Sequence, residues 1–351
     1  MKPADFILHR ARHLNPGSFA LVMATGIVSI DVNQHGMHGL ALALFGINLL
    51  AWLVLLALSA VRLLRFRQDL VADFVDPARG AGFLTLAAGT CVLGSQCLLV
   101  VYLPALAGAL ALLGALFWAM LTYLFFAATI TARIKPSFTR SINGGWLVAV
   151  VATQALAVLL VLLVADQASL HTVWLFSALC LYLLGDALYL LIITLVVYRM
   201  VFFPLRAREF TPPYWIDMGA LAITTLAGSL IVLHTPATNP LTDLMPFVKG
   251  FTLFFWATAT WWVPLLVMLE IWRHDWRHVP IRYEVDDWDI VFPLGMYTVG
   301  TFELAQALQL DFLQTIPAVG VYISLLVWLL VAGGGLRRGY RALVSRDARH
   351  S

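Results

Sequence analysis

The chain has 351 residues, of which 61% are hydrophobic and 12% are charged, and its formal net charge is +3. Soluble domains carry about 25% charged residues, so this composition indicates an integral membrane protein. The small net charge gives no support for nucleic-acid binding. The three cysteines lie inside apolar segments, which argues against a disulfide framework.

Apolar segments long enough to cross a bilayer, which takes about 20 residues, recur along the whole sequence. The loops between them are too short to hold a soluble domain, so we expect residues 1–351 to form a single all-α membrane domain. The polar N-terminus also predicts that no signal peptide is cleaved. In chain order, the ten predicted transmembrane helices are 17–34, 39–64, 80–101, 105–130, 142–165, 171–199, 213–234, 245–272, 288–309 and 314–338.

The basic residues predict the orientation of these helices. Every Lys and Arg except Lys249 lies at a terminus or in the second, fourth, sixth or eighth connection, and all of these are on one side of the membrane. Basic loops remain in the cytoplasm. We therefore expect a multi-pass protein of the inner or plasma membrane with both termini cytoplasmic.

The odd-numbered helices begin at regular intervals, near residues 17, 80, 142, 213 and 288. This spacing predicts a duplicated helix pair, giving five parallel-repeated helical hairpins. The odd helices are shorter and richer in small and hydroxylated residues, which favour close packing or a polar path, whereas the even helices are long and rich in Leu and Val. We therefore expect an inner ring around a central pore, although any single small residue could merely pack helices together.

All odd helices would start on the cytoplasmic side, several of them with a capping residue and proline, as in Asn15-Pro16 and Thr211-Pro212. Helix N-termini carry partial positive charge. Five of them beside flanking arginines would favour an anion at the cytoplasmic mouth.

The ninth helix contains Phe292 next to Pro293. A proline removes a backbone hydrogen bond and distorts a helix, and a neighbouring aromatic ring can close a narrow path as an apolar constriction. Taken alone, such a pair more often only packs.

The stretches 15–26 (NPGSFALVMATG) and 291–297 (VFPLGMY) resemble the tellurite-resistance/dicarboxylate transporter family. That family includes the bacterial TehA type, yeast malate permeases and sulfite pumps, and plant slow anion channels. The resemblance extends over the whole chain through its helices and short loops. It implies five hairpins around a central pore, homotrimers with one pore per subunit, and an aromatic gate that corresponds to Phe292. The residues around Pro293 are closer to the permease-like branch.

We expect a set of small and aromatic residues on the odd helices to line the pore, with Phe292 as its gate. These are Phe19, Thr25, Gly26, Phe83, Gly89, Trp146, Thr153, Gly228, Pro293, Met296 and Gly300.

Carboxylates inside a membrane are costly and therefore functional candidates. Glu303 follows Phe292 by eleven residues, about 16 Å along the same helix face, so we hypothesise that it couples proton and anion movement; the alternative is a helix contact or outer water. For Asp186 we expect a helix or subunit contact, and for Asp217 an N-terminal stabilising role. Asp31 should reach water at the outer end of its helix.

These features predict a channel or secondary carrier for small monovalent anions or C4-dicarboxylates. The alternative is a proton-coupled exporter or permease for dicarboxylate, sulfite or tellurite. A membrane-embedded enzyme or receptor is a third class, but the sequence has no catalytic or nucleotide-binding motif. The expected partners are small inorganic or organic anions, the lipid bilayer and two further copies of the chain, with no nucleic acid, cofactor or metal. Gly333–Gly335 should end the last helix.

Overall fold

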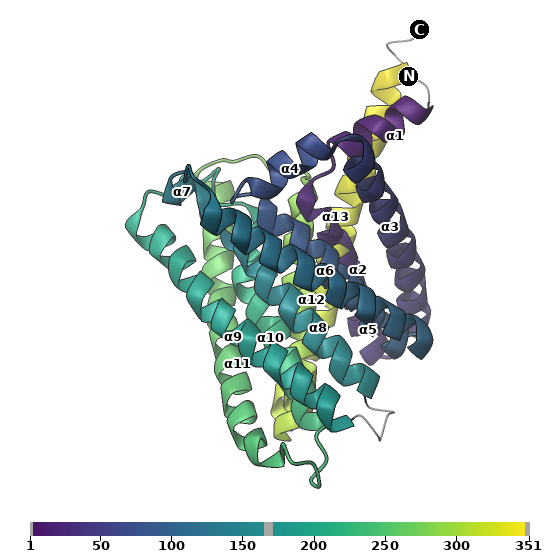
Figure 1. Ribbon diagram of the computed structural model, residues 1–351, viewed down its shortest axis with the longest axis vertical. Helices are drawn as coiled ribbons and strands as arrows, with labels where there is room; N and C mark the ends of the chain where they lie inside the picture. Colours follow the sequence, from purple (N-terminus) through teal and green to yellow (C-terminus); the bar gives the residue numbers. More distant parts are fainter. Residues whose placement is uncertain (1–2, 165–170, 348–351) are drawn as a thin grey trace.

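The structure is a computed structural model that describes residues 3–164 and 171–347 (Figure 1). In these ranges the chain is almost entirely helical and has no strand. Residue 165, where the fifth predicted span would end, lies outside the described part. All the other predicted ends fall within a few residues of the observed helix ends, except at the C-terminus.

The long helices fall into two sets that alternate along the chain. The first set consists of α2 (Ala20–Gln34), α5 (Thr85–Leu99), α8 (Val148–Val164), α10 (Ile216–Leu233) and α12 (Trp288–Leu308). The second set consists of α3 (His38–Arg65), α6 (Pro104–Thr131), α9 (His171–Phe202), α11 (Met245–Ile271) and α13 (Thr315–Asp347). The three short helices are α1 (Pro3–Arg12), α4 (Arg67–Val75) and α7 (Phe138–Ser141).

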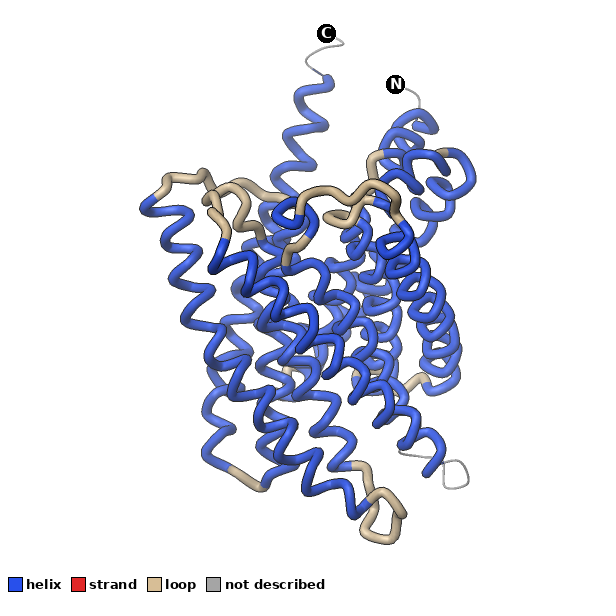
Figure 2. The backbone as a smooth tube through the Cα atoms, turned by 60° about the vertical axis from the view of Figure 1, so that its left-hand side comes forward, coloured by secondary structure: helices blue, strands red, loops and turns tan. Residues whose placement is uncertain are grey.

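The first set forms a closed inner ring, in which α2 contacts α5, α5 contacts α8, α8 contacts α10, α10 contacts α12, and α12 returns to α2. Each helix of the second set packs outside the inner helix that precedes it and also contacts the next one. The tube in Figure 2 shows the resulting bundle, with loops at its two ends. The ring encloses an axis on which the candidate site lies.

Nine helices of the described part are long and apolar enough to cross a membrane. The exception among the long helices is α12, which carries Asp289 and Glu303 and packs between α10 and α2. The prediction of an all-helical membrane protein is confirmed. The count of ten spans and the duplicated origin of the hairpins remain predictions.

A short 3₁₀ turn precedes each helix of the inner ring: η1 (Pro16–Phe19), η2 (Gly80–Leu84), η3 (Gly144–Leu147), η4 (Pro212–Trp215) and η7 (Val285–Asp287). Asn side chains cap two of them, because Asn15 accepts a hydrogen bond from the amide of Gly17 at 2.9 Å and Asn143 accepts one from Gly145 at 2.8 Å. These bonds satisfy amides that have no partner within the helix. A 3₁₀ turn thus marks the start of each ring helix, and the five starts lie at one end of the bundle.

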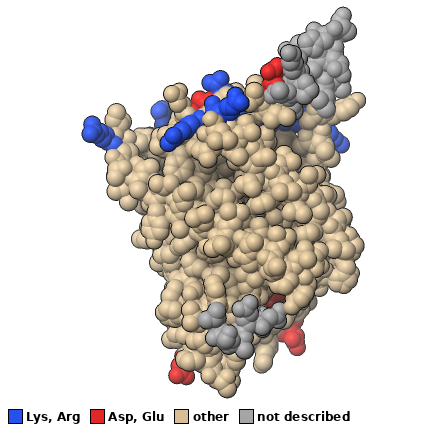
Figure 3. Space-filling model, turned by 45° about the vertical axis from the view of Figure 1, so that its right-hand side comes forward, with Lys and Arg blue, Asp and Glu red and all other residues tan. Residues whose placement is uncertain are grey.

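The same end carries the basic residues, as the blue side chains in Figure 3 show for the visible face. Here α4, which the sequence analysis did not predict, is held by ion pairs. Asp73 contacts Arg62 and Arg79, each at 2.5 Å, and Asp69 contacts Arg12 at 2.7 Å. A helix of nine residues is too short to be detected as a span.

Four tryptophans tie an outer helix to the next inner helix by the same hydrogen bond, from the indole Nε1 to a threonine Oγ1. The pairs are Trp52–Thr90 at 3.0 Å, Trp118–Thr153 at 2.8 Å, Trp256–Thr301 at 2.9 Å and Trp328–Thr25 at 3.1 Å. Between α9 and α10 the outer residue is Tyr182, which bonds to Thr252 of α11 instead. The last pair joins α13 to α2 and therefore closes the bundle.

The expected end of the last helix was wrong. Helix α13 runs through Gly333–Gly335 to Asp347. A Cβ at Gly334 or Gly335 would lie 3.2 or 3.1 Å from the ring of Tyr283. These glycines therefore give room for a packed aromatic ring, and they do not interrupt the helix.

Candidate functional site

One face of α12 is aligned with the axis of the ring. Asp289, Phe292, Met296, Val299 and Glu303 are spaced by three or four residues, which places them on a single stripe of the helix. Met296, Val299 and Glu303 line one cavity, and Asp289 lines another. Phe292 lies on the stripe between the two cavities.

The first of these, the lower cavity, lies between the C-terminal halves of the inner helices and has a volume of about 150 Å³. All five inner helices contribute to its wall, which is mostly aliphatic and has only four polar side chains. The contributing residues are Ile27, Ile30, Gln34, Val92, Ser95, Leu99, Ala155, Val158, Leu162, Ile223, Leu226, Leu230, His234, Met296, Val299 and Glu303.

The second, the upper cavity, has a volume of about 180 Å³ and lies at the starts of the same helices, at the end that carries the arginines. Its wall is more polar, and all five 3₁₀ turns or their flanking residues contribute. The lining includes Asn15, Arg79, Thr85, Asn143, Thr211, Asp286 and Asp289. The two cavities therefore lie one above the other on the ring axis.

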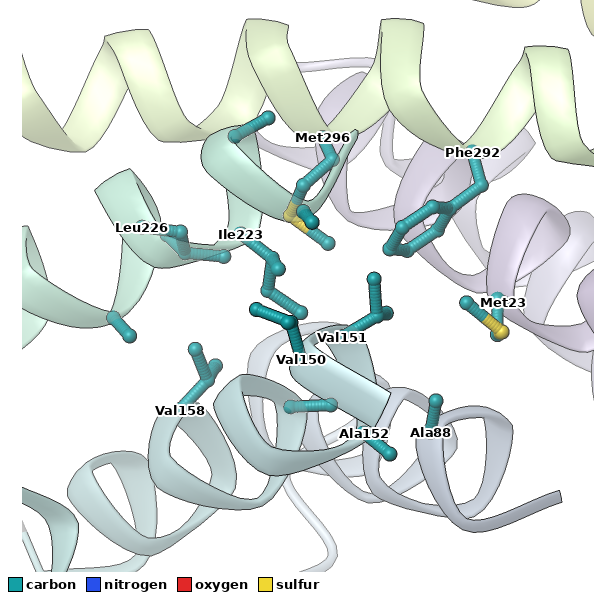
Figure 4. Close-up of a cluster of buried hydrophobic side chains, with 14 of the residues drawn as sticks. Met23, Ala88, Val150, Val151, Ala152, Val158, Ile223, Leu226, Phe292 and Met296 are labelled. Carbon is teal, nitrogen blue, oxygen red and sulfur yellow. The ribbon is translucent and has the colours of Figure 1, made fainter. Parts of the chain in front are cut away.

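A layer of buried apolar side chains surrounds Phe292 (Figure 4). The ring of Phe292, only 1% exposed, points towards Met23 and Val151, and Ala88 completes the layer from α5. These four side chains come from four of the five inner helices and belong to one packed cluster. In the described structure these buried side chains lie between the two cavities.

Pro293 lies inside α12, which continues through it. Its ring packs against α10, where a Cβ on Gly219 would lie 2.7 Å from Pro293 Cγ. Because a proline has no N–H, the backbone carbonyl of Asp289 lacks its usual helical donor. The proline thus brings α12 close to α10.

In the lower cavity, Glu303 Oε1 accepts a hydrogen bond of 2.7 Å from Gln34 Nε2. The opposite wall carries His234, whose Nδ1 lies 2.9 Å from the carbonyl of Leu230. Glu303 and Phe292 thus share the axial face, as their spacing predicts. The other polar side chains of this wall are those of Gln34, Ser95 and His234.

The threonines and glycines expected to line the pore lie at helix contacts and are not part of either cavity wall. Thr25 and Thr153 accept the hydrogen bonds from Trp328 and Trp118 described above. A Cβ at any of the four glycines would meet a neighbouring helix. The nearest atoms are Val92 Cγ1 at 2.6 Å for Gly26, Phe19 O at 3.3 Å for Gly89, Thr252 Oγ1 at 2.0 Å for Gly228 and Ala222 O at 2.8 Å for Gly300.

The expected aromatic lining residues also lie off the axis. Phe19 packs in a cluster that includes Trp52 of α3, and Phe83 packs edge-on against Phe74 at a centroid distance of 5.2 Å. Trp146 donates hydrogen bonds of 2.8 Å to the carbonyls of Pro77 and Ser141. Of the residues predicted for the site, the structure brings together on the axis only Phe292, Met296 and Glu303.

The buried carboxylates of Asp186 and Asp217 line neither cavity. Asp186 on α9 accepts a hydrogen bond of 3.1 Å from Gln154 of α8, which is the helix contact that the sequence predicts. Asp217 in the first turn of α10 is fully buried, and neither carboxylate oxygen has a partner in the described part.

The expectation for Asp31 was wrong. It is fully buried, accepts a hydrogen bond of 2.7 Å from Ser324 of α13, and lies 3.4 Å from His35 Nδ1. The C-terminal helix covers the end of α2, so Asp31 does not reach water.

Sequence reasoning missed most of the axial stripe. On α8, for example, Val148, Val151, Ala155, Val158 and Leu162 repeat at intervals of three and four. This periodicity is present in the sequence, but in an all-apolar helix it cannot be distinguished from the faces that contact other helices or lipid. The polar residues Asp286 and Asp289 at the helix start were the available signal for the upper cavity.

A multi-pass bundle with stacked cavities along a closed helical ring has the architecture of a channel or transporter. Residues 13–336 match the family described as voltage-dependent anion channel. The chain belongs to this family, which confirms the resemblance noted in the sequence. Membership implies transport of anions across a membrane, and the family is one of channels, not of enzymes.

Two similar proteins are uncharacterized transporters of Methanocaldococcus jannaschii. One is 22% identical over 332 residues, covering 90% of this chain and 88% of the relative. The other is 20% identical over 346 residues, covering 94% and 96%. An uncharacterized membrane protein of Mycobacterium tuberculosis is 40% identical over 164 residues, 47% of this chain and 82% of the relative.

Proposed function

We propose that the chain is an anion conduit whose path follows the axis of the inner ring and whose gate is the Phe292 side chain. The observation that carries this proposal is the pair of cavities on that axis, interrupted by a single apolar layer. An anion cannot pass a dry hydrocarbon constriction without losing its hydration, so a buried aromatic ring there closes the path. Rotation of the ring would join the cavities.

The walls of the path favour small monovalent anions. The lower cavity has no Lys or Arg in its wall. In the upper cavity the only such residue is Arg79, which is paired with Asp73. A dicarboxylate would need fixed cations to replace its hydration, whereas a monovalent anion is held by weaker groups such as amides and helix starts.

The basic residues and the family support a proposal for the orientation and assembly of the conduit. We propose that the arginine-rich end, with both termini, faces the cytoplasm of a cell whose inner or plasma membrane holds the protein. We propose further that three copies assemble, as the family resemblance implies. Each copy would have its own pore, because each chain's ring is closed by its own α13–α2 contact.

The gate is tested by truncating Phe292 to alanine and measuring nitrate and chloride flux in proteoliposomes. Phe292→Ala should raise flux about tenfold or more, because it removes the largest side chain of the closing layer. Phe255→Ala is the matched control, since Phe255 is also fully buried but packs against Tyr189 on α9. The control should lose stability and keep wild-type flux. Unchanged flux in Phe292→Ala, or an equal rise in the control, would refute the gate.

A second candidate function is a proton-coupled carrier for C4-dicarboxylate or sulfite, and the bond between Glu303 and Gln34 in the lower cavity favours it. An ionised carboxylate on the path would repel anions, so a proton on Glu303 would have to accompany the anion. The charged or titratable neighbour in that wall is His234. The relative fluxes of chloride, nitrate, sulfite and malate separate the two functions by substrate, and Glu303→Gln should abolish any coupling of malate or sulfite flux to a pH gradient. Unchanged pH dependence in that variant would exclude Glu303.

A further inference from the structure

The upper cavity has an unexpected charge for the entrance of an anion conduit. Its wall contains two carboxylates, Asp286 and Asp289, and one cation, Arg79. Five helix starts favour an anion there, but two ionised carboxylates at the same position would oppose it. The protonation state of these carboxylates therefore bears on whether an anion can enter.

Asp289 is the carboxylate closest to the gate along the chain. It lies in the first turn of α12, on the axial stripe, about 4.5 Å of helix rise before Phe292. Its side chain is only 8% exposed, yet it lines the cavity. In the described part it has no hydrogen bond and no ion pair. A buried carboxylate without a partner can bind a ligand from the cavity, and a proton is the smallest such ligand.

The charged groups around Asp289 leave it uncompensated. Asp286 accepts a hydrogen bond of 2.8 Å from Asn15, and burial raises the pKa of Asp286 above its ordinary value. Asp287 accepts from the amide of Glu284 at 2.9 Å and completes the capping box of η7. Arg79 is bound to Asp73, outside the cavity wall.

The turns that start α8 and α10 add no charge to this wall. The polar side chains that they and their flanking residues contribute are Asn143 and Thr211, which do not titrate. The cavity wall therefore has two acidic side chains and a cation that is already paired, so its charge is set by the protons on the acids.

We propose that Asp289 is a proton-binding site at the arginine-rich mouth, and that an anion enters the upper cavity only when this carboxylate is protonated. This inference rests on the proposed conduit and adds its substrate class. Proton and anion pass the mouth as a pair, so the natural substrates are small weak acids, such as monocarboxylates or hydrogen-bearing oxyanions. The proton comes from the water or the acid at the mouth and binds a carboxylate oxygen of Asp289.

The test measures flux of nitrate, a permanent anion, in oriented proteoliposomes while the pH on the arginine-rich side is varied. In the wild-type chain, acidification on that side should raise nitrate flux by about tenfold for each carboxylate of the cavity wall that becomes protonated. Asp289→Asn should have high flux at every pH, and Asp289→Glu should restore the pH dependence. Acetate flux should exceed nitrate flux in the wild type and match it in Asp289→Asn.

Asp217→Asn is the matched control, because Asp217 occupies the first turn of the neighbouring ring helix but does not line either cavity. It should keep the wild-type pH dependence. A wild-type flux that ignores pH on the arginine-rich side would overturn the inference even if no variant folds. So would an Asp289→Asn protein with wild-type pH dependence.

The two proposals fail separately in this assay. If Phe292→Ala leaves flux unchanged, the conduit itself is wrong. If Phe292→Ala raises flux but Asp289→Asn does not alter its pH dependence, only the role of Asp289 is wrong.

Discussion

The inner and outer helices differ most in what surrounds them. In the four inner spans long and apolar enough to cross a membrane, 72% to 89% of the central window is buried inside the protein, against 22% to 33% in the outer spans. The inner helices are also the ones with more small and hydroxylated residues. Because lipid is as apolar as a leucine side chain, burial in a membrane protein is set by packing and polar contacts and not by hydrophobicity.

The two classes therefore use glycine differently. On the inner ring, glycines allow backbones to touch: a Cβ on Gly144 would lie 2.3 Å from the carbonyl of Pro213, and one on Gly300 would lie 2.8 Å from that of Ala222. On the outer helices, Gly46 and Gly108 have no atom within 4 Å of the added Cβ. Outer glycines that face the ring, namely Gly114, Gly185 and Gly320, also have neighbours at 2.5 to 2.6 Å, but these are side-chain atoms. The contrast is therefore between ring glycines that touch backbone and outer glycines that face outwards into open space.

Substitution of these glycines should give the largest effect. Gly144→Ala forces η3 away from backbone atoms of η4 that cannot rotate aside, and we expect a loss of about 3 kcal/mol in unfolding free energy. Gly108→Ala should change stability by less than about 1 kcal/mol, in the stabilising direction, because alanine has the higher helix propensity. Denaturant unfolding in detergent micelles measures both. Equal effects at the two positions would break the distinction between the classes.

The tryptophan bonds between the classes should have an intermediate effect. Trp328→Phe keeps most of the buried ring but removes the 3.1 Å hydrogen bond to Thr25, and buried bonds of this kind contribute about 0.6 to 1.7 kcal/mol in membranes. Trp261→Phe is the control, since this outer tryptophan is 61% exposed. Trp328→Phe should lower the unfolding midpoint more than Trp261→Phe does. A larger loss in Trp261→Phe would contradict the interpretation.

The smallest effect should come from a carboxylate at the start of the ring. Burial raises the pKa of Asp286, so the folded state favours the protonated carboxyl group. Protonation of Asp286 therefore stabilises the fold. This contribution is complete below the ordinary pKa of 3.8 and is lost as the pH rises through the raised pKa. Asp286→Asn keeps an acceptor for Asn15 and should flatten this pH dependence, with a gain under about 1 kcal/mol at neutral pH. Thermal unfolding between pH 4 and 8 measures it.

An exposed carboxylate gives the comparison for that measurement. Asp311 lies in η8 (Asp311–Gln314) ahead of the outer helix α13 and is exposed. Asp311→Asn should change the unfolding temperature little at any pH. If both variants respond alike, burial at the ring start is not the cause.

The sequence was most informative about features that depend on long segments. The helix ends, the alternation of two helix classes and the family could be read from hydropathy, charge and motifs, because each signal is summed over many residues. Short helix α4 was not predicted, since its charged residues obscure it. The end of α13 was misplaced because three glycines break most soluble helices, whereas here Tyr283 packs against two of them.

The candidate site was harder to predict because it depends on which face of each helix turns inward. Phe292 and Glu303 were found through a family motif and an intramembrane charge. The glycines and threonines were assigned to the pore because they are small or polar, but in the structure their partners are other helices. Only the three-dimensional arrangement separates a residue that faces an axis from one that faces the next helix.

The bond between Trp328 and Thr25 joins the last long helix to the first, and both α1 and the end of α13 lie at the same end of the molecule. In a ring of helices closed in this way, no single helix has a special mechanical role. A circularly permuted gene, opened in another loop at this end and with its old ends joined by a linker, would encode the same helix neighbours in a different order of synthesis.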